Sequence, residues 1–170
     1  MPGTFNGTTL TISATPVDRA PIPDEGATNV AGIAIVGSDM YCVKTTGLKT
    51  TLLKTTDYTT AKATAVKKDL NWFALGLTKI GNYLYMLAED HKGYGGSTTI
   101  VKLDTKGNQL GTYNIKNICP NGALGITAAD GTNEKFIIMH YTDSNNAGTL
   151  TFSVVNWKEL LYFKTTAKIA

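Results

Sequence analysis

An internal repeat limits the folds open to this 170-residue chain more than any other property of its sequence. Three segments align on a glycine followed by an apolar run, and these anchor glycines, Gly32, Gly76 and Gly125, are 44 and 49 residues apart. In the first two units a tyrosine follows nine residues after the glycine, at Tyr41 and Tyr85. A period of about 40–50 residues predicts that each unit is one supersecondary element, which buries its apolar faces against its neighbours.

Each unit contains four short strand candidates, separated by turns rich in Gly, Asn and Asp. No unit shows the 3.6-residue apolar spacing of a helical repeat. The expected strands are Gly32–Val36, Met40–Lys44, Thr50–Thr55 and Ala61–Lys67 in the first unit, Leu75–Ile80, Tyr83–Glu89, Thr98–Asp104 and Gln109–Ile115 in the second, and Gly125–Ala128, Phe136–Tyr141, Thr149–Val155 and Leu160–Lys164 in the third. Four antiparallel strands in 44–49 residues are typical of a β-propeller blade. We therefore predict an all-β fold of three four-stranded antiparallel propeller-like blades, at about 29–70, 71–120 and 121–170; the alternative is a β-sandwich.

The second unit resembles the blades of NHL-like and quinoprotein-like β-propellers. In those families a Gly-Asn-x-Leu-Tyr strand leads to an Ile-x-Lys-Leu-Asp-x-x-Gly hairpin, and the matching segments here are 81–87 and 100–108. The resemblance covers residues 30–166 in outline and is clear in this one blade. It implies a fold and no particular activity, because such blades occur in enzymes, lectins, scaffolds and receptors. The third unit departs from the pattern, since Trp157-Lys158-Glu159 replaces the Asp-x-x-Gly turn.

Composition agrees with short strands and argues against nucleic-acid binding. The chain has 27 threonines and 17 glycines, and 17% of its residues are charged, below the roughly 25% typical of soluble domains. Its net charge of +3 rests on 15 dispersed lysines and the single Arg19, whereas readers of nucleic acid and phosphate rely on arginine. No apolar run approaches the roughly 20 residues of a membrane-spanning helix, and no signal peptide is visible. We expect no nucleic-acid partner and no membrane insertion; virion, cytoplasm and mature secreted protein remain open as compartments.

Three blades do not close a ring, because single-ring propellers have roughly four to eight. Residues 1–28 add an N-terminal strand at Thr8–Thr15, which could join a neighbouring sheet, and an arm at Pro16–Glu25 whose prolines exclude a central strand. Unpaired sheet edges and apolar blade faces favour self-association. The first expectation is therefore a homodimer or higher oligomer, in which two copies make six blades. A monomer capped by the arm and a fragment of a longer propeller are the alternatives.

The loops after the second strands supply most of the candidate ligand-binding residues, because propellers gather such loops on one face of the ring. Asp143-Ser144-Asn145 loosely resembles the start of a calcium loop but lacks its closing glutamate, so a plain turn is expected. Tyr94, between two glycines, and Trp157, in a turn, are the aromatic candidates for stacking on a sugar. The full candidate set is Asp90, His91, Tyr94, Asp143, Asn145 and Trp157.

The sequence offers no catalytic residues, no metal site and no cofactor. It contains no nucleophile elbow, zinc-binding helix, phosphate-binding loop or dinucleotide-binding turn. His140 shares strand parity with Ile138, so we expect it to point into a packed face. Cys42 lies in an apolar run, where a buried free thiol is expected, and Cys119 shares no metal-ligand spacing with it.

These observations predict a non-catalytic β-propeller-like interaction and assembly module, for instance a structural subunit of a virion or a surface assembly. Other assembly subunits or glycans are the further partners. A lectin-like carbohydrate-binding protein is the alternative function, and an enzyme is not expected.

Overall fold

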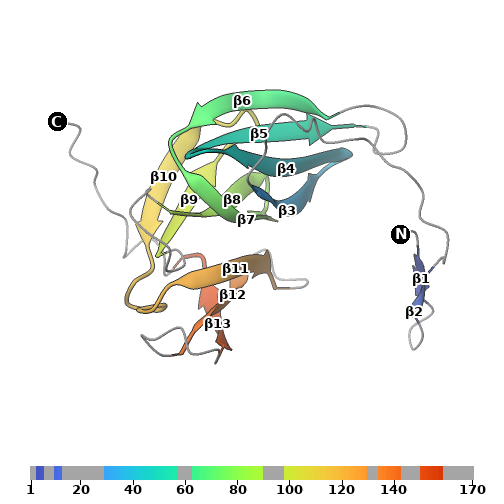
Figure 1. Cartoon of the computed structure of the whole chain (residues 1–170). Coiled ribbons are helices and arrows are strands. Elements are labelled where there is room, and N and C mark those ends of the chain that lie inside the picture. Colours follow the sequence, from blue (N-terminus) through green and yellow to red (C-terminus); the bar gives the residue numbers. More distant parts are fainter. Residues whose placement is uncertain are drawn as a thin grey trace.

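The computed structural model describes residues 3–5, 10–12, 29–56, 63–89, 98–129, 134–142 and 150–158, and these residues form strands joined by turns (Figure 1). The strands are β1 (Gly3–Phe5), β2 (Leu10–Ile12), β3 (Asn29–Val36), β4 (Asp39–Thr46), β5 (Lys49–Thr55), β6 (Thr64–Leu70), β7 (Phe73–Ile80), β8 (Tyr83–Glu89), β9 (Thr99–Leu103), β10 (Gln109–Asn114), β11 (Ala123–Ala128), β12 (Lys135–Tyr141) and β13 (Leu150–Asn156). The fold is all-β, as predicted. Within the described residues there is no helix long and apolar enough to cross a bilayer.

The strands form three antiparallel meanders, each paired in sequence order, which are the three predicted blades. The first blade is β3-β4-β5-β6, the second is β7-β8-β9-β10, and the third is β11-β12-β13. The inner strand β7 packs between the inner strands β3 and β11, as in the inner ring of a propeller (Figure 1). The row of blades is open at both ends. The fourth strand expected in the third blade, Leu160–Lys164, lies outside the described residues.

Strand boundaries follow the sequence closely in the second blade and less well at the end of the first. The expected Ala61–Lys67 strand is Thr64–Leu70 in the structure, displaced toward the C-terminus. Two register shifts in the β5–β6 pairing carry β6 past Lys67, so that Leu70 pairs with Thr50. Burial of the Leu70 side chain, which is 8% exposed, makes this longer strand favourable.

The N-terminal strand does not join a blade. Leu10–Ile12 pairs with Gly3–Phe5 in a separate two-stranded sheet (Figure 1). The Pro16–Glu25 arm lies outside the described residues.

Strand alternation gives every blade two distinct faces. We call the face turned toward the following blade the leading face and the opposite one the trailing face. One core cluster joins the leading face of the first blade to the trailing face of the second, with Val43 and Leu52 against Met86 and Val101. A second cluster joins the leading face of the second blade to the trailing face of the third: Tyr85, Leu87, Ile100, Phe136 and Ile138 belong to it. The apolar faces between consecutive blades thus form the core.

The anchor glycines of the repeat lie where neighbouring inner strands approach most closely. Each lies within one residue of a β-bulge in its inner strand. Gly32 has a φ of +66°, and a Cβ there would lie 2.6 Å from the Cα of Leu77 in the next blade. A Cβ on Gly76 would lie 3.2 Å from the Cγ2 of Ile126 in the blade after that. The recurring glycine therefore permits close packing of one blade on the next.

Threonine hydroxyls satisfy backbone donors across the same junctions. The N–H of Ala74 in the second blade donates to Thr45 and Thr50 of the first at 3.3 and 3.2 Å. Thr50 Oγ1 donates to the carbonyl of Trp72 at 2.7 Å, so in its 2.8 Å bond with Thr45 it accepts. At the next junction, Thr78 Oγ1 accepts the N–H of Ala128 at 2.9 Å. Buried backbone donors require such partners, which is one reason why threonine is abundant in this chain.

The Asp-x-x-Gly turn owes its residue types to the hydrogen bonds of Asp104. Its Oδ1 accepts the backbone N–H groups of Lys106 and Asn108 at 2.9 and 2.8 Å, and its Oδ2 accepts the Asn108 side-chain amide at 2.9 Å. Desolvation would raise the pKa of Asp104, but the hydrogen bonds from Asn108 and Lys106, together with the Lys106 charge, outweigh it and hold the pKa below its usual value. In the third blade Asn156 takes the equivalent place, with Oδ1 accepting the N–H of Lys158 at 2.9 Å. The departure at Trp157-Lys158-Glu159 therefore keeps this capping bond.

We expect Asp104→Ala to lower the free energy of unfolding by about 1 kcal/mol at neutral pH, because the turn loses its acceptor. Since the pKa is lower in the folded state than in the unfolded state, the ionised carboxylate stabilises the fold above the unfolded pKa, near 4. That stabilisation is lost as the pH falls through the folded value. Urea unfolding between pH 7 and pH 2.5 should show the variant and the wild type converging in acid. A constant difference would mean that the carboxylate charge plays no part.

Candidate functional site

Most of the predicted ligand-binding residues cannot be placed. Asp90, His91, Tyr94, Asp143 and Asn145 lie outside the described residues, and their grouping on one ring face stays a prediction.

Trp157 is the one candidate that the structure describes, and it is packed against other side chains. It is half-buried and adjoins the second core cluster. The ammonium of Lys102 lies 5.6 Å from its ring, 3.9 Å from the ring of Tyr83 and 5.8 Å from that of Tyr85. Burial lowers the pKa of Lys102. The Trp157 ring therefore participates in a cation–π group between the second and third blades.

The buried polar groups of the blades take part in packing. His140 is 6% exposed, as expected for a residue that points into a packed face. Its Nδ1 lies 3.1 Å from the carbonyl oxygen of Tyr141, which only accepts, so Nδ1 carries the proton. Its Nε2 lies 2.8 Å from Ser153 Oγ, and in the neutral ring it accepts the hydroxyl proton. Both ring nitrogens thus have hydrogen-bond partners, one within β12 and one on the neighbouring strand β13.

The two thiols are buried and free, as expected for Cys42. Burial raises the pKa of Cys42 and raises that of Cys119 to about 11, so both remain protonated at neutral pH. Among the residues that the structure describes, no three His, Cys, Asp or Glu side chains gather where they could hold a metal ion.

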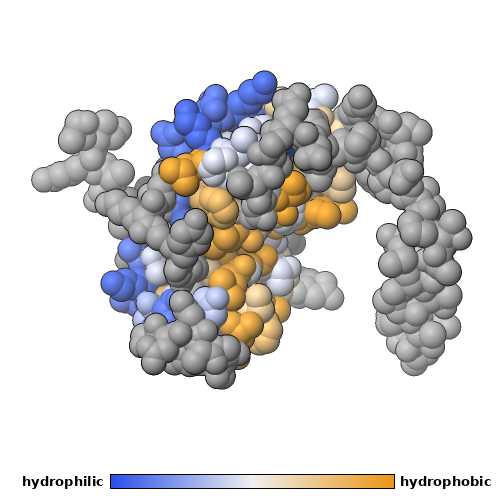
Figure 2. Space-filling model, in the orientation of Figure 1, coloured by the Kyte–Doolittle hydropathy of each residue, from blue (hydrophilic) through white to orange (hydrophobic). Residues whose placement is uncertain are grey.

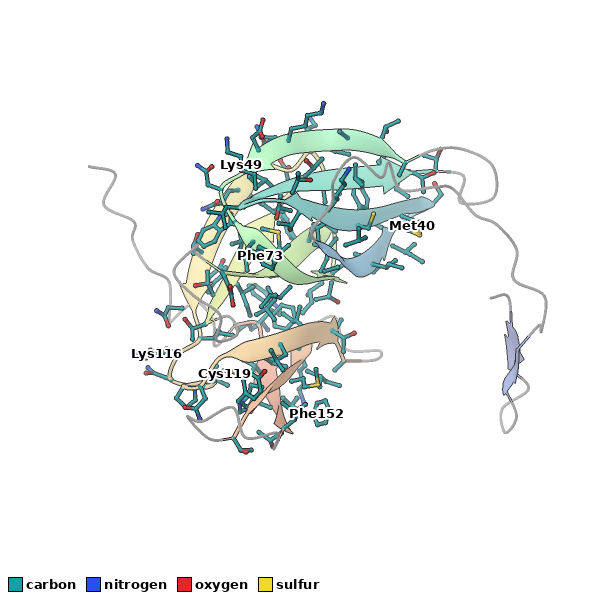
Figure 3. The ribbon with its side chains drawn as sticks, viewed as in Figure 1. Met40, Lys49, Phe73, Lys116, Cys119 and Phe152 are labelled. Atoms are coloured by element: carbon teal, nitrogen blue, oxygen red, sulfur yellow. The ribbon has the colours of Figure 1, made fainter. Side chains whose placement is uncertain are left out.

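The exposed large apolar side chains in the described part of the third blade, Leu150, Phe152 and Val154, all lie on its leading face. Cross-strand pairing sets Ile137 beside Val154, Met139 beside Phe152, and Tyr141 beside Leu150. Phe152 is 67% exposed and Val154 63%. Figure 3 shows Phe152 at the outer end of the third blade, away from the first blade, and Figure 2 shows apolar colouring over this blade.

The trailing face of the first blade is the second surface with exposed apolar side chains, and these lie on its inner strand β3. Ile33 pairs with Cys42, and Ile35 with Met40, so these four side chains share that face. Ile33 is 65% exposed and Ile35 53%, while Cys42 is buried in a small cluster with Leu53 and Ala63. Met40 is labelled at the edge of this blade in Figure 3.

The repeat register shows what these two faces lack. Phe152, opposite Met139, is the equivalent of Leu52, opposite Val43, and of Ile100, opposite Leu87. Leu52 and Ile100 are fully buried against the following blade, whereas the residues that the structure describes place no following blade beside Phe152. We therefore take the two end faces as the candidate functional site. The sequence predicted apolar blade faces that favour self-association, but the predicted ligand-binding residues lie in loops and turns and include none of these side chains. The sequence does contain a signal for this face. Leu150, Phe152 and Val154 are apolar at every second position of one strand, and Phe152 aligns with core positions of the other two units.

Comparison with solved structures supports the propeller-like fold. The chain resembles regucalcin from Agrobacterium tumefaciens, a calcium-binding protein with a β-propeller fold, at 15% identity and a TM-score of 0.51, covering 75% of this chain and 45% of that one. This chain thus spans less than half the length of regucalcin. A weaker similarity is to a 2S albumin seed protein from Dolichos, at 15% identity and a TM-score of 0.37, covering 73% of this chain and 66% of that one. Another is to hemopexin fold protein CP4 from cow pea, at 12% identity and a TM-score of 0.35, covering 75% of this chain and 67% of that one.

No family model and no curated protein matches the sequence. The fold and the similarity to regucalcin define a β-propeller-type domain with an open row of blades. The finer resemblance to NHL-like and quinoprotein-like blades stays a prediction.

Proposed function

We propose that this chain is a non-catalytic β-propeller-type interaction and assembly module that associates with further copies of itself, as a structural subunit of a virion or a surface assembly does. The observation that carries the proposal is the exposure of apolar side chains at both ends of the blade row: Phe152 and Val154 at one end, Ile33 and Ile35 at the other. Covering such a surface with protein releases about 25 cal/mol per Å² of apolar area. Contiguous exposed apolar patches are typical of protein contact sites.

The carbohydrate-binding alternative has less support. Five of its six candidate residues lie outside the described residues, and Trp157 is engaged with Lys102. A stacking platform for a sugar needs an accessible ring face, which is the reason to prefer assembly.

Hydroxyl-radical footprinting over a concentration series tests the assembly function. As the protein associates, oxidation of Phe152 should fall several-fold, because its ring becomes covered. Tyr83 is the internal control: this aromatic residue is 42% exposed and begins β8 in the second blade, which carries neither end face. Oxidation of Phe152 that is the same at all concentrations would contradict the proposal.

A further inference from the structure

We propose that the leading face of the third blade binds the trailing face of the first blade in a second copy of this chain, so that two copies close a six-bladed ring with two-fold symmetry. The inference rests on the assembly function proposed above and specifies its partner and register. It is supported by three features that recur, half-complete, at the two ends of the row: two are found at both internal junctions and one at the junction of the second and third blades.

The first feature is the glycine contact. At both internal junctions the anchor glycine of one blade packs on the residue that follows the anchor glycine of the next: Gly32 on Leu77, and Gly76 on Ile126. Gly125 is the third anchor, and the contact found around it is with Met139 of its own blade, at 3.6 Å from an added Cβ. At the other end, Ile33 follows the first anchor and is 65% exposed, while its equivalent Leu77 is 2% exposed. Within the described part of the chain, the last anchor glycine thus has no large residue of a following blade on it, and Ile33 at the other end has no anchor glycine of a preceding blade on it.

The second feature is a hydrogen bond. Two residues after its anchor, Thr78 accepts the N–H of Ala128, which lies three residues after the next anchor. Thr127 is the equivalent of Thr78 in the third blade and is exposed. Ile35 is the equivalent of Ala128 in the first blade. Packing the two end faces in the register of the junction between the second and third blades brings the Thr127 hydroxyl to the Ile35 N–H.

The third feature is the side-chain content of the faces. Leading faces bury Leu52 in the first junction and Ile100 in the second, both at 0% exposure. Phe152 is the apolar residue at this position in the third blade, and it is 67% exposed. The same register that buries Leu52 near Leu77 brings Phe152 over Ile33 of the second copy.

Ring closure limits the number of copies. Single-ring propellers have roughly four to eight blades, so two copies fit and three copies, with nine blades, do not. The matched part of regucalcin is 45% of its length, consistent with this chain being about half of a ring. A two-fold axis gives two identical contacts, each between the third blade of one copy and the first blade of the other.

Charge complementation tests this register. Phe152→Lys or Ile33→Glu alone places an unpaired charge in both contacts and should raise the dimer dissociation constant about a hundredfold. An equimolar mixture of the two variants pairs Lys with Glu in one contact and leaves the other unaltered, so dimers should return to within about tenfold of wild type. Light scattering coupled to size exclusion reads the masses. Leu110→Lys, on β10 and 46% exposed in the wild type, is the control for adding a charge elsewhere and should leave the mass unchanged.

The outcomes separate the two proposals. A mixture of Phe152→Lys with Ile33→Lys is the matched control of the wrong sign and should remain monomeric. If both mixtures stay monomeric, or both form dimers, while the wild type associates, the register is wrong and the assembly function stands, as it would for a contact between two third blades. If the wild type is monomeric at every concentration, the assembly function and the ring are both overturned.

Discussion

Gly32→Ala is expected to lower the free energy of unfolding by about 2–5 kcal/mol. Two costs add at this position. The φ of +66° is unfavourable for any residue with a Cβ, and the new methyl group would overlap the backbone of Leu77 in the next blade. Because the new methyl group and the Leu77 atoms it meets both belong to or adjoin the backbone, neither can move aside as a flexible side chain could. The variant should therefore separate the first blade from the second. Urea unfolding in the Phe152→Lys background measures this without a contribution from association.

Gly37→Ala is the matched control. Gly37 has a nearly equal φ of +62°, but an added Cβ meets nothing within 4 Å. Its cost should be about 1–2 kcal/mol, from the backbone conformation alone. Equal losses for the two variants would mean that the close approach of the inner strands plays no part in stability.

Phe136→Ala is expected to cost about 3–5 kcal/mol, because it empties a fully buried site between the second and third blades. The Phe136 ring also makes an edge contact with Tyr85, with centroids 4.9 Å apart and an interplanar angle of 63°. A loss of this size is a large part of the 5–15 kcal/mol that holds typical domains folded. The third blade should therefore open first, and hydrogen exchange of the β12 and β13 amides should accelerate more than that of β4 and β5.

Phe136→Leu retains most of the volume and should cost less than about 1.5 kcal/mol. Leu110→Ala, at an exposed position on β10, should change the free energy of unfolding by no more than about 0.5 kcal/mol. If Phe136→Ala were as mild as either control, the second core cluster would not hold the third blade in place.

The fold could be predicted from the sequence because turns and strand parity are local signals. The expected strand Tyr83–Glu89 is β8, since the Gly-Asn turn before it fixes its beginning. The end of the first blade was less predictable: β6 shifts to Thr64–Leu70 through register changes against β5, and no local signal marks those. The pairing of Leu10–Ile12 with Gly3–Phe5 was likewise not predicted, because the sequence of a strand does not mark which other strand it pairs with.

The candidate site was harder to predict because exposure depends on the order of the blades. Phe152 and Ile100 have the same place in their repeats and the same apolar character, yet one is exposed and the other is buried. They differ because Ile100 is covered by the third blade and Phe152 is at the end of the row. The sequence of one repeat unit does not show whether another blade follows it. The count of three blades predicts open apolar faces in general. Which side chains lie on those faces becomes evident only when the blades are stacked in order.

Native mass spectrometry of the wild-type protein tests the central claim, the closed pair of half-rings, most directly. We predict one dominant species at twice 18.2 kDa over a wide range of concentrations, with no larger species, because closure of the ring satisfies every open face. A ladder of higher multiples would mean that the same contact propagates without closing, and a monomer at 18.2 kDa at all concentrations would mean that the end faces do not bind each other. Either result would contradict the six-bladed ring.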